Sequence, residues 1–235
     1  MSGRAAPGGR GVAAVPASGD RRRYPAPAAL AFFHGPMDCG KSTLALQIDH
    51  NQARQGRCGL LLVRHDRSGP ARISSRLGMS RTAIEITDEL DLVELVRSRW
   101  AAGARVDYLV VDEAQFLAPA QVEALVDLVD DSHVDVYAFG ITTDFRGRLF
   151  PGSQRLLELA DSVEQLQVEV LCWCGRPGRL NARVVGGRVA RAGDTVLVAD
   201  TAAEAPVHYQ VLCRAHHRAG DLGPGAPAPG QLTLG

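Results

Sequence analysis

The sequence lacks a membrane-spanning segment, a secretory signal and the excess of basic residues that a nucleic-acid-binding protein normally has. No apolar run approaches the roughly 18 to 20 residues of a membrane-spanning helix, and residues 1–27 contain no apolar stretch typical of a secretory signal. Basic and acidic residues number 26 each, whereas a general nucleic-acid binder is normally markedly basic. We therefore expect neither a membrane partner nor a nucleic-acid partner.

Cysteine is scarce, and its five copies are an odd number. Three of them fall in two late clusters, which favours a bound metal in a reduced compartment, the cytoplasm, over a disulfide scaffold. Of the other two, Cys58 is expected in the core and Cys39 is expected to be incidental to its loop. The sequence also lacks an internal repeat, and its 235 residues are enough for one α/β domain and a small module.

The most specific stretch is Gly35-Pro36-Met37-Asp38-Cys39-Gly40-Lys41-Ser42, followed by Thr43. It fits G-x-x-x-x-G-K-[ST], a loop whose glycines let backbone N–H groups point at phosphate oxygens. The Lys41 ammonium would bind the β- and γ-phosphates of a nucleotide such as ATP, and the Ser42 hydroxyl would ligate Mg²⁺. An apolar run at 28–33 leads in like a buried strand, and helical spacing follows, so a helix N-terminus would face the anion.

Strands and helices alternate after this loop. Further buried strands are predicted at 58–63, 108–111 and 134–140, and helices at about 42–56, 89–102 and 119–131. This alternation predicts an α/β fold with a parallel sheet and helices on both faces. The polar segment 64–81 is long for a connection and predicts a mobile active-site loop. The expected organisation is a disordered tail over 1–27, a nucleotide-binding domain over 28–167, a metal-binding module over 168–217 and a second disordered tail over 218–235.

The strand predicted at 108–111 ends in a pair of acids, Asp112-Glu113. At the carboxyl end of a strand, Asp112 can hold Mg²⁺ directly or through water. Glu113 lies one residue further and can polarise an attacking oxygen, which is water in an ATPase and a substrate hydroxyl in a kinase. The acid pair and the phosphate loop together predict nucleotide hydrolysis or phosphoryl transfer and do not decide between them.

Four potential metal ligands occur late in the chain as Cys172-x-Cys174 and Cys213-x-x-His216. Their separation is typical of a zinc ribbon, in which two hairpin tips hold one structural Zn²⁺ that maintains the fold. The C-x-C spacing is tighter than the usual C-x-x-C, which makes Cys172 the least certain ligand, and His217 is an alternative to His216. Five nearby arginines keep open a nucleic-acid-binding ribbon: Arg176, Arg179, Arg183, Arg188 and Arg191.

These features occur in the order found in type II thymidine kinases, which the chain resembles over roughly residues 28–217. The resemblance is carried by the Gly-Pro-Met start of the loop, by Asp112-Glu113-Ala114-Gln115-Phe116, by the segment 140–153 with its Thr-Asp-Phe-Arg-Gly, and by the Cys/His clusters. It implies a RecA-like core with a zinc-containing lasso module. It also implies transfer of a phosphoryl group from Mg·ATP to the 5′-hydroxyl of thymidine, with deoxyuridine a second candidate substrate, in a homotetramer.

The resemblance also assigns roles to single residues. Glu113 would be the general base, and Asp112 and Ser42 would serve Mg²⁺. Gln115 would touch the nucleotide or cap the next helix. Thymine would be surrounded by Met37, Phe116, Ile141, Phe145 and Phe150, and the nucleoside would lie near Arg183 and Tyr209. A lid would include Asp66, Arg67 and 75–76, and the backbone between about 196 and 209 would hydrogen-bond the base. Without the resemblance, Phe145 and Phe150 would be expected in an ordinary core.

Overall fold

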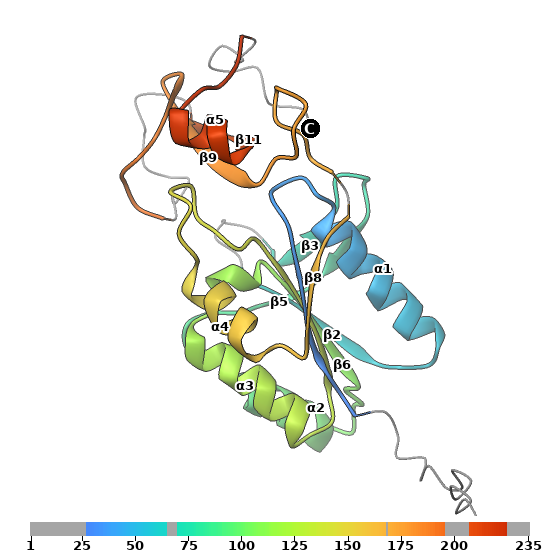
Figure 1. Ribbon diagram of the computed structural model, residues 1–235. Coiled ribbons are helices and arrows are strands. Elements are labelled where there is room, and N and C mark those ends of the chain that lie inside the picture. The colour runs from blue at the N-terminus through green and yellow to red at the C-terminus, as the bar shows by residue number, and fades with distance from the viewer. Residues whose placement is uncertain (1–26, 65–69, 168, 196–206, 225–235) are drawn as a thin grey trace, which may run out of the picture.

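The computed structural model describes residues 27–64, 70–167, 169–195 and 207–224. These residues form a six-stranded sheet, a separate three-stranded sheet and a two-stranded hairpin (Figure 1). None of the helices in this described part has the length and apolar composition that a membrane crossing requires. The large sheet carries the phosphate loop, and the small sheet lies beyond the end of the large sheet from which that loop emerges (Figure 1).

The six strands of the large sheet are all parallel. Their order across the sheet is β5 (Ile84–Glu85), β2 (Gly59–Val63), β6 (Tyr108–Asp112), β7 (Asp135–Gly140), β1 (Leu30–His34) and β8 (Ser162–Gln165). Successive side chains of a strand point to opposite faces, so each central strand contributes to two cores. On β6, for example, Leu109 and Val111 face one core while Tyr108 and Val110 face the other.

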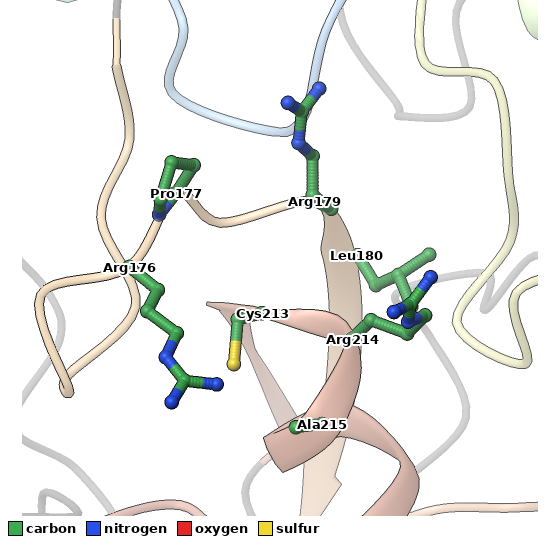
Figure 2. Close-up of a pocket in the computed structure, with 7 residues that line it drawn as sticks. All are labelled: Arg176, Pro177, Arg179, Leu180, Cys213, Arg214 and Ala215. Atoms are coloured by element: carbon green, nitrogen blue, oxygen red, sulfur yellow. The ribbon is translucent and has the colours of Figure 1, made fainter.

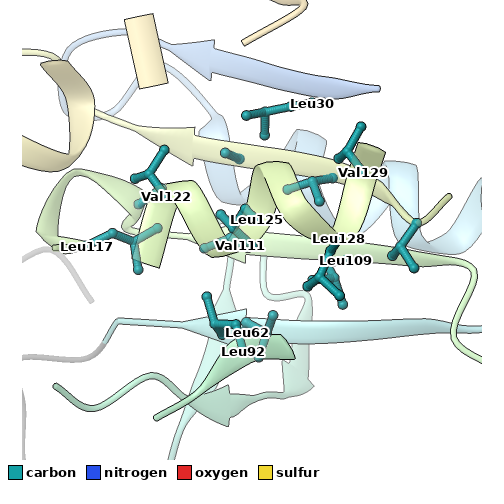
Figure 3. Packing of buried hydrophobic residues seen from close by; sticks show 14 of the residues in the cluster. Leu30, Leu62, Leu92, Leu109, Val111, Leu117, Val122, Leu125, Leu128 and Val129 are labelled. Carbon is teal, nitrogen blue, oxygen red and sulfur yellow. The ribbon is translucent and has the colours of Figure 1, made fainter. Parts of the chain in front are cut away.

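Helices cover both faces of this sheet, as the alternating sequence pattern predicts. The elements are α1 (Lys41–Arg54) on one face, and α2 (Leu92–Ala101), α3 (Pro119–Asp130) and α4 (Pro151–Leu159) on the other (Figure 1). The second face holds the larger core, where Val122, Leu125 and Val129 of α3 pack over the strands (Figure 3). The prediction of an α/β fold with a parallel sheet between helices is confirmed.

The polar segment expected to be one long loop is in part a hairpin. Strands β3 (Arg72–Ser74) and β4 (Ser80–Thr82) pair antiparallel, and Ile73 reaches the core beside α1. Arg81 of β4 forms an ion pair with Asp49 of α1 at 3.2 Å. Asp66 and Arg67 of the expected lid lie outside the described residues. The expectation for Cys58 is wrong, because its side chain is exposed at the start of β2.

The small sheet is antiparallel and forms the body of the metal-binding module. It consists of β9 (Leu180–Val185), β10 (Arg188–Val189) and β11 (Val207–Leu212), followed by the short helix α5 (Arg214–Ala219). Its core is small and includes two of the cysteines, Cys172 and Cys213. A bound metal would add much to the stability of a module with so few buried side chains.

Candidate active site

The phosphate loop joins β1 to α1, and its shape explains the residues at its fixed positions. A Cβ on Gly35 would lie 2.5 Å from Cys39 Sγ, so only glycine fits there, and Gly40 has a φ of +83°. The Lys41 ammonium is buried and donates to the carbonyl oxygens of Gly35 at 3.3 Å and Pro36 at 2.8 Å. The loop therefore holds a positive charge at the N-terminus of α1, where an anion is favoured.

The end of β6 meets this loop directly. Ser42 Oγ donates to Asp112 Oδ2 at 2.8 Å, and the Glu113 N–H donates to Asp112 Oδ1 at 3.0 Å. Burial, followed by the nearby charge of Glu113, raises the pKa of Asp112 to about 6. A divalent cation bound by the Ser42 hydroxyl and the Asp112 carboxylate would offset the repulsion between the carboxylates of Asp112 and Glu113. The donor set therefore fits Mg²⁺.

Positive charge from the metal-binding module adds to that of the loop. A cavity of about 510 Å³ lies beside Cys213, with Arg176, Arg179 and Arg214 on its walls (Figure 2). The Arg179 side chain leaves this cavity toward the phosphate loop and donates to Gln165 Oε1 at 2.9 Å. Burial and the charges of Arg179 and Lys41 lower the pKa of His34, the last residue of β1.

Glu113 follows Asp112 and is the N-cap residue of a short 3-10 helix, η1 (Ala114–Phe116). Its backbone is left-handed, with a φ of 56°, which is uncommon for a residue other than glycine. Its carboxylate accepts a hydrogen bond from the side-chain amide of Gln115, and that amide also accepts from the backbone N–H of Ile141 at 3.1 Å. The structure thus brings together three residues singled out from the sequence: Glu113 just before η1, Gln115 within it and Ile141 just after β7.

The residues expected around a flat base fall into two neighbouring groups. Phe116 and Phe150 meet edge to face, with ring centroids 5.3 Å apart. Phe145 belongs to the second group, in which the Arg183 guanidinium carbon lies 3.9 Å from its ring centroid. Met37 joins this region through its backbone N–H, which donates to Asn181 Oδ1 at 2.9 Å.

Arg183 is almost completely buried, with 2% of its surface exposed. Its guanidinium donates to Tyr209 Oη at 3.1 Å and to the carbonyl oxygens of Asp194 at 2.6 Å and Thr195 at 2.9 Å. A side chain held in this way is not available to an oligonucleotide, so Arg183 drops out of the proposed nucleic-acid-binding face. Most of the backbone expected to bind the base, residues 196–206, lies outside the described part of the chain.

The loop that carries Phe145 is fixed by Asp144, a residue for which the sequence suggested no role. The buried carboxylate accepts from the backbone N–H groups of Arg146 at 2.9 Å and Arg148 at 3.0 Å. Burial opposes ionisation, but these hydrogen bonds and the Arg146 side chain hold the pKa of Asp144 below its ordinary value. The run Asp144-Phe145-Arg146-Gly147, an Asp three residues before a Gly, is a turn signal that could have indicated this role.

The four candidate metal ligands converge. The ligand atoms of Cys172, Cys174, Cys213 and His216 all lie within 4.8 Å of one another. Cys174 Sγ and Cys213 Sγ are 4.0 Å apart, and Cys172 Sγ lies 3.4 Å from His216 Nδ1. Zn–S bonds of about 2.3 Å at the tetrahedral angle place two sulfurs about 3.8 Å apart, so the geometry fits Zn²⁺.

The structure also decides between the two histidines and accommodates the tight C-x-C spacing. His217 is buried, and its Nε2 lies 2.9 Å from the Phe145 carbonyl oxygen, away from the cluster. Trp173, between the two cysteines, turns outward and stacks on His216 with ring centroids 4.2 Å apart. Cys172 therefore belongs to the cluster, and His217 connects the module to the loop that carries Phe145.

These features define a P-loop nucleotide-dependent enzyme. A strand of the parallel sheet leads into the phosphate loop, an acid pair lies at the end of another strand of that sheet, and a cysteine-rich module is joined to it. The chain belongs to the thymidine kinase family, whose sequence model, described as "Thymidine kinase", matches residues 28–217. Membership makes it an ATP-dependent nucleoside kinase, a transferase. The resemblance found in the sequence motifs is confirmed.

Individual relatives agree with this assignment. The chain is 57% identical over 191 residues to a thymidine kinase of Streptomyces coelicolor, covering 80% of this chain and 88% of that protein. It is 55% identical over 196 residues to a thymidine kinase of Cutibacterium acnes, covering 83% of this chain and 91% of that protein. A solved structure of the Pif1 helicase from Candida albicans matches only weakly, with a TM-score of 0.36 and 12% identity over 59% of this chain and 36% of that one, and adds nothing on function.

Proposed function

We propose that this chain transfers the γ-phosphoryl group of Mg·ATP to the 5′-hydroxyl of thymidine and so produces dTMP. The observation that carries the proposal is the 2.8 Å hydrogen bond between Ser42 and Asp112, which joins the phosphate loop to the end of β6. Glu113 is the next residue after Asp112, and we propose it as the base. The relatives of this chain, which carry the name thymidine kinase, support the choice of nucleoside.

In this proposal the protein contributes charge and position, as phosphoryl transfer generally requires. The loop amides and Lys41 bind the phosphates of ATP. Ser42 and Asp112 would hold Mg²⁺, which would neutralise negative charge on the phosphates. Glu113 accepts the proton of the 5′-hydroxyl as the hydroxyl oxygen attacks the γ-phosphorus, and the bond between the γ-phosphorus and the β–γ bridging oxygen breaks to release ADP.

The nucleoside lies between the large sheet and the metal-binding module. An apolar, partly aromatic slot with a few fixed polar groups suits a pyrimidine with a 5-methyl group. The proposed slot residues are Met37, Phe116, Ile141, Phe145 and Phe150, with Arg183 and Tyr209 on the module side. Zn²⁺ at the cysteine cluster is structural in this proposal and keeps the module side of the slot in place.

A nucleoside panel with Mg·ATP tests the proposal. Phosphate from labelled ATP should appear on the 5′ position of thymidine, as separated by chromatography. Deoxyuridine, which lacks only the methyl group, should react with kcat/KM lower by about tenfold, because an unfilled methyl site is worth roughly that much. Release of free phosphate without any nucleotide product would instead identify an ATPase and overturn the proposal.

We also propose that the enzyme works in the cytoplasm without membrane or nucleic-acid partners, as its composition indicates, and as the homotetramer that the resemblance implies. All five cysteines are free, which agrees with a reducing compartment. The equal numbers of acidic and basic residues, 26 each, agree with a small-molecule substrate. Exposed apolar side chains at Leu149, Leu157 and Val163, near α4 and the edge strand β8, offer a surface for another copy.

A further inference from the structure

We propose that Gln115 is a positioning residue that aims the Glu113 carboxylate at the reacting hydroxyl. The inference rests on the proposed function, in which Glu113 is the base. Gln115 is 2% exposed, and both ends of its amide are bonded to protein groups. In this inference, its contribution to the reaction is made through Glu113.

The orientation of the Gln115 amide follows from its partners. A backbone N–H can only donate, so Gln115 Oε1 must face the Ile141 N–H, 3.1 Å away. The Nε2 group then necessarily faces Glu113 Oε2 and donates to it. This hydrogen bond restricts rotation of the Glu113 carboxylate.

Neighbouring groups hold the amide and the turn in place. A Cβ on Gly140 would lie 2.8 Å from Gln115 Oε1, and a Cβ on Gly152 would lie 2.9 Å from the Gln115 carbonyl oxygen. Both positions are glycine, which lets β7 and α4 press against η1. Ser153 Oγ donates to the Ile141 carbonyl oxygen at 2.6 Å. Ile141, whose N–H orients the Gln115 amide, is therefore also held by a hydrogen bond to its carbonyl.

Glu113 needs such a partner because little else directs it. Its backbone is in the left-handed region, and in the described part of the chain no arginine, lysine or histidine forms an ion pair with it. The Gln115 amide bonds one carboxylate oxygen, which leaves the other oxygen for the substrate hydroxyl. Losing this bond would let the carboxylate rotate away, and small misplacements of a reacting group reduce the rate strongly.

The test is the Gln115→Glu variant. It keeps an oxygen for the Ile141 N–H but removes the donor to Glu113. We expect kcat to fall by about 10- to 100-fold, with the KM values for ATP and thymidine close to those of the parent. Gln115→Met has a similar size and no charge and should lose kcat likewise, which separates the lost donor from repulsion between carboxylates. Melting temperatures of both variants check folding.

Gln121 provides a matched control. It is also a buried glutamine, whose amide accepts from the Ala118 N–H at 3.1 Å and donates to the Thr87 carbonyl at 2.8 Å. Gln121→Glu removes the same kind of donor at the start of α3, where no base is present. It should keep the parent kcat.

A double-mutant cycle with Glu113→Gln decides whether Gln115 acts through Glu113. If it does, Gln115→Met costs nothing further once Glu113 is replaced. An equal loss of kcat in both backgrounds, or a raised KM for ATP with kcat retained, would overturn the inference. Turnover of Glu113→Gln alone tests the proposed base separately, so a failure there is distinguishable from a failure of the role of Gln115.

Discussion

Replacing Glu113 with glutamine should lower kcat for thymidine phosphorylation by about 10²-fold or more, as expected for loss of a general base. Glutamine has nearly the same shape, and its carbonyl oxygen can still accept the hydrogen bond from Gln115. The phosphate loop is untouched, so the affinity for a non-hydrolysable ATP analogue should stay near that of the parent. Steady-state kinetics and calorimetric titration measure the two quantities.

A second glutamate makes the control for that experiment. Glu123 on α3 is exposed and pairs with Arg155 at 3.1 Å on the surface. Glu123→Gln makes the same chemical change away from the site and should leave kcat unchanged, because exposed ion pairs contribute little. Near-normal turnover of Glu113→Gln would remove Glu113 from the role of base.

Removing the metal should cost the small module its fold. Structural zinc contributes about 10 to 16 kcal/mol in zinc-finger peptides, and the module has few buried side chains to replace it. Cys213→Ser should therefore lose bound zinc and greatly weaken thymidine binding, because the module carries Arg183 and Tyr209. Binding of the ATP analogue, which depends on the large sheet, should change much less.

Trp173 reports the state of the cluster because it stacks on His216. In a Trp100→Phe background, with Trp173 the remaining tryptophan, its emission should change on chelation and in Cys213→Ser. Cys58→Ser removes an exposed thiol outside the cluster and should keep one zinc per chain and the parent emission. Full zinc content and unchanged emission in Cys213→Ser would contradict the metal site.

Local sequence patterns account well for the centre of the fold. The phosphate loop and the strand that ends in Asp112 are predictable because their chemistry fixes the residues at each position. Central strands such as β6 and β7 are buried on both faces and so form continuous apolar runs. The Cys/His spacing likewise predicts a metal site, because two separated pairs of Cys and His residues are typical of zinc ligands.

Edge elements were missed because they carry no such pattern. The edge strand β8, Ser162–Gln165, is mostly exposed, and β5 contains only Ile84–Glu85. The hairpin of β3 and β4 buries Ile73 alone, so its residues look like a polar loop. These segments are ordered by neighbours that already form a sheet and not by their own periodicity.

Contacts between segments that are distant in the sequence could not be predicted from local sequence patterns either. The side chain of Asn181 accepts a hydrogen bond from the backbone N–H of Met37, 144 residues earlier in the sequence. The ring of His217 hydrogen-bonds the carbonyl oxygen of Phe145, 72 residues earlier. Asn181 belongs to no motif, the sequence pattern offered His217 only as an alternative metal ligand, and each role depends on where the module lies against the large sheet. Gln115 was singled out in the sequence, but its hydrogen bonds to Glu113 and Ile141 could be found only from the structure.

A crystal structure with thymidine and a non-hydrolysable ATP analogue would test the central claim most directly. It should place the 5′-oxygen within about 3.2 Å of the Glu113 carboxylate, which is hydrogen-bond reach, and in line with the γ-phosphorus held by the phosphate loop. The thymine ring should lie among Phe116, Phe145 and Phe150. A nucleoside bound elsewhere, with the Glu113 carboxylate turned away from its 5′-oxygen, would contradict the account.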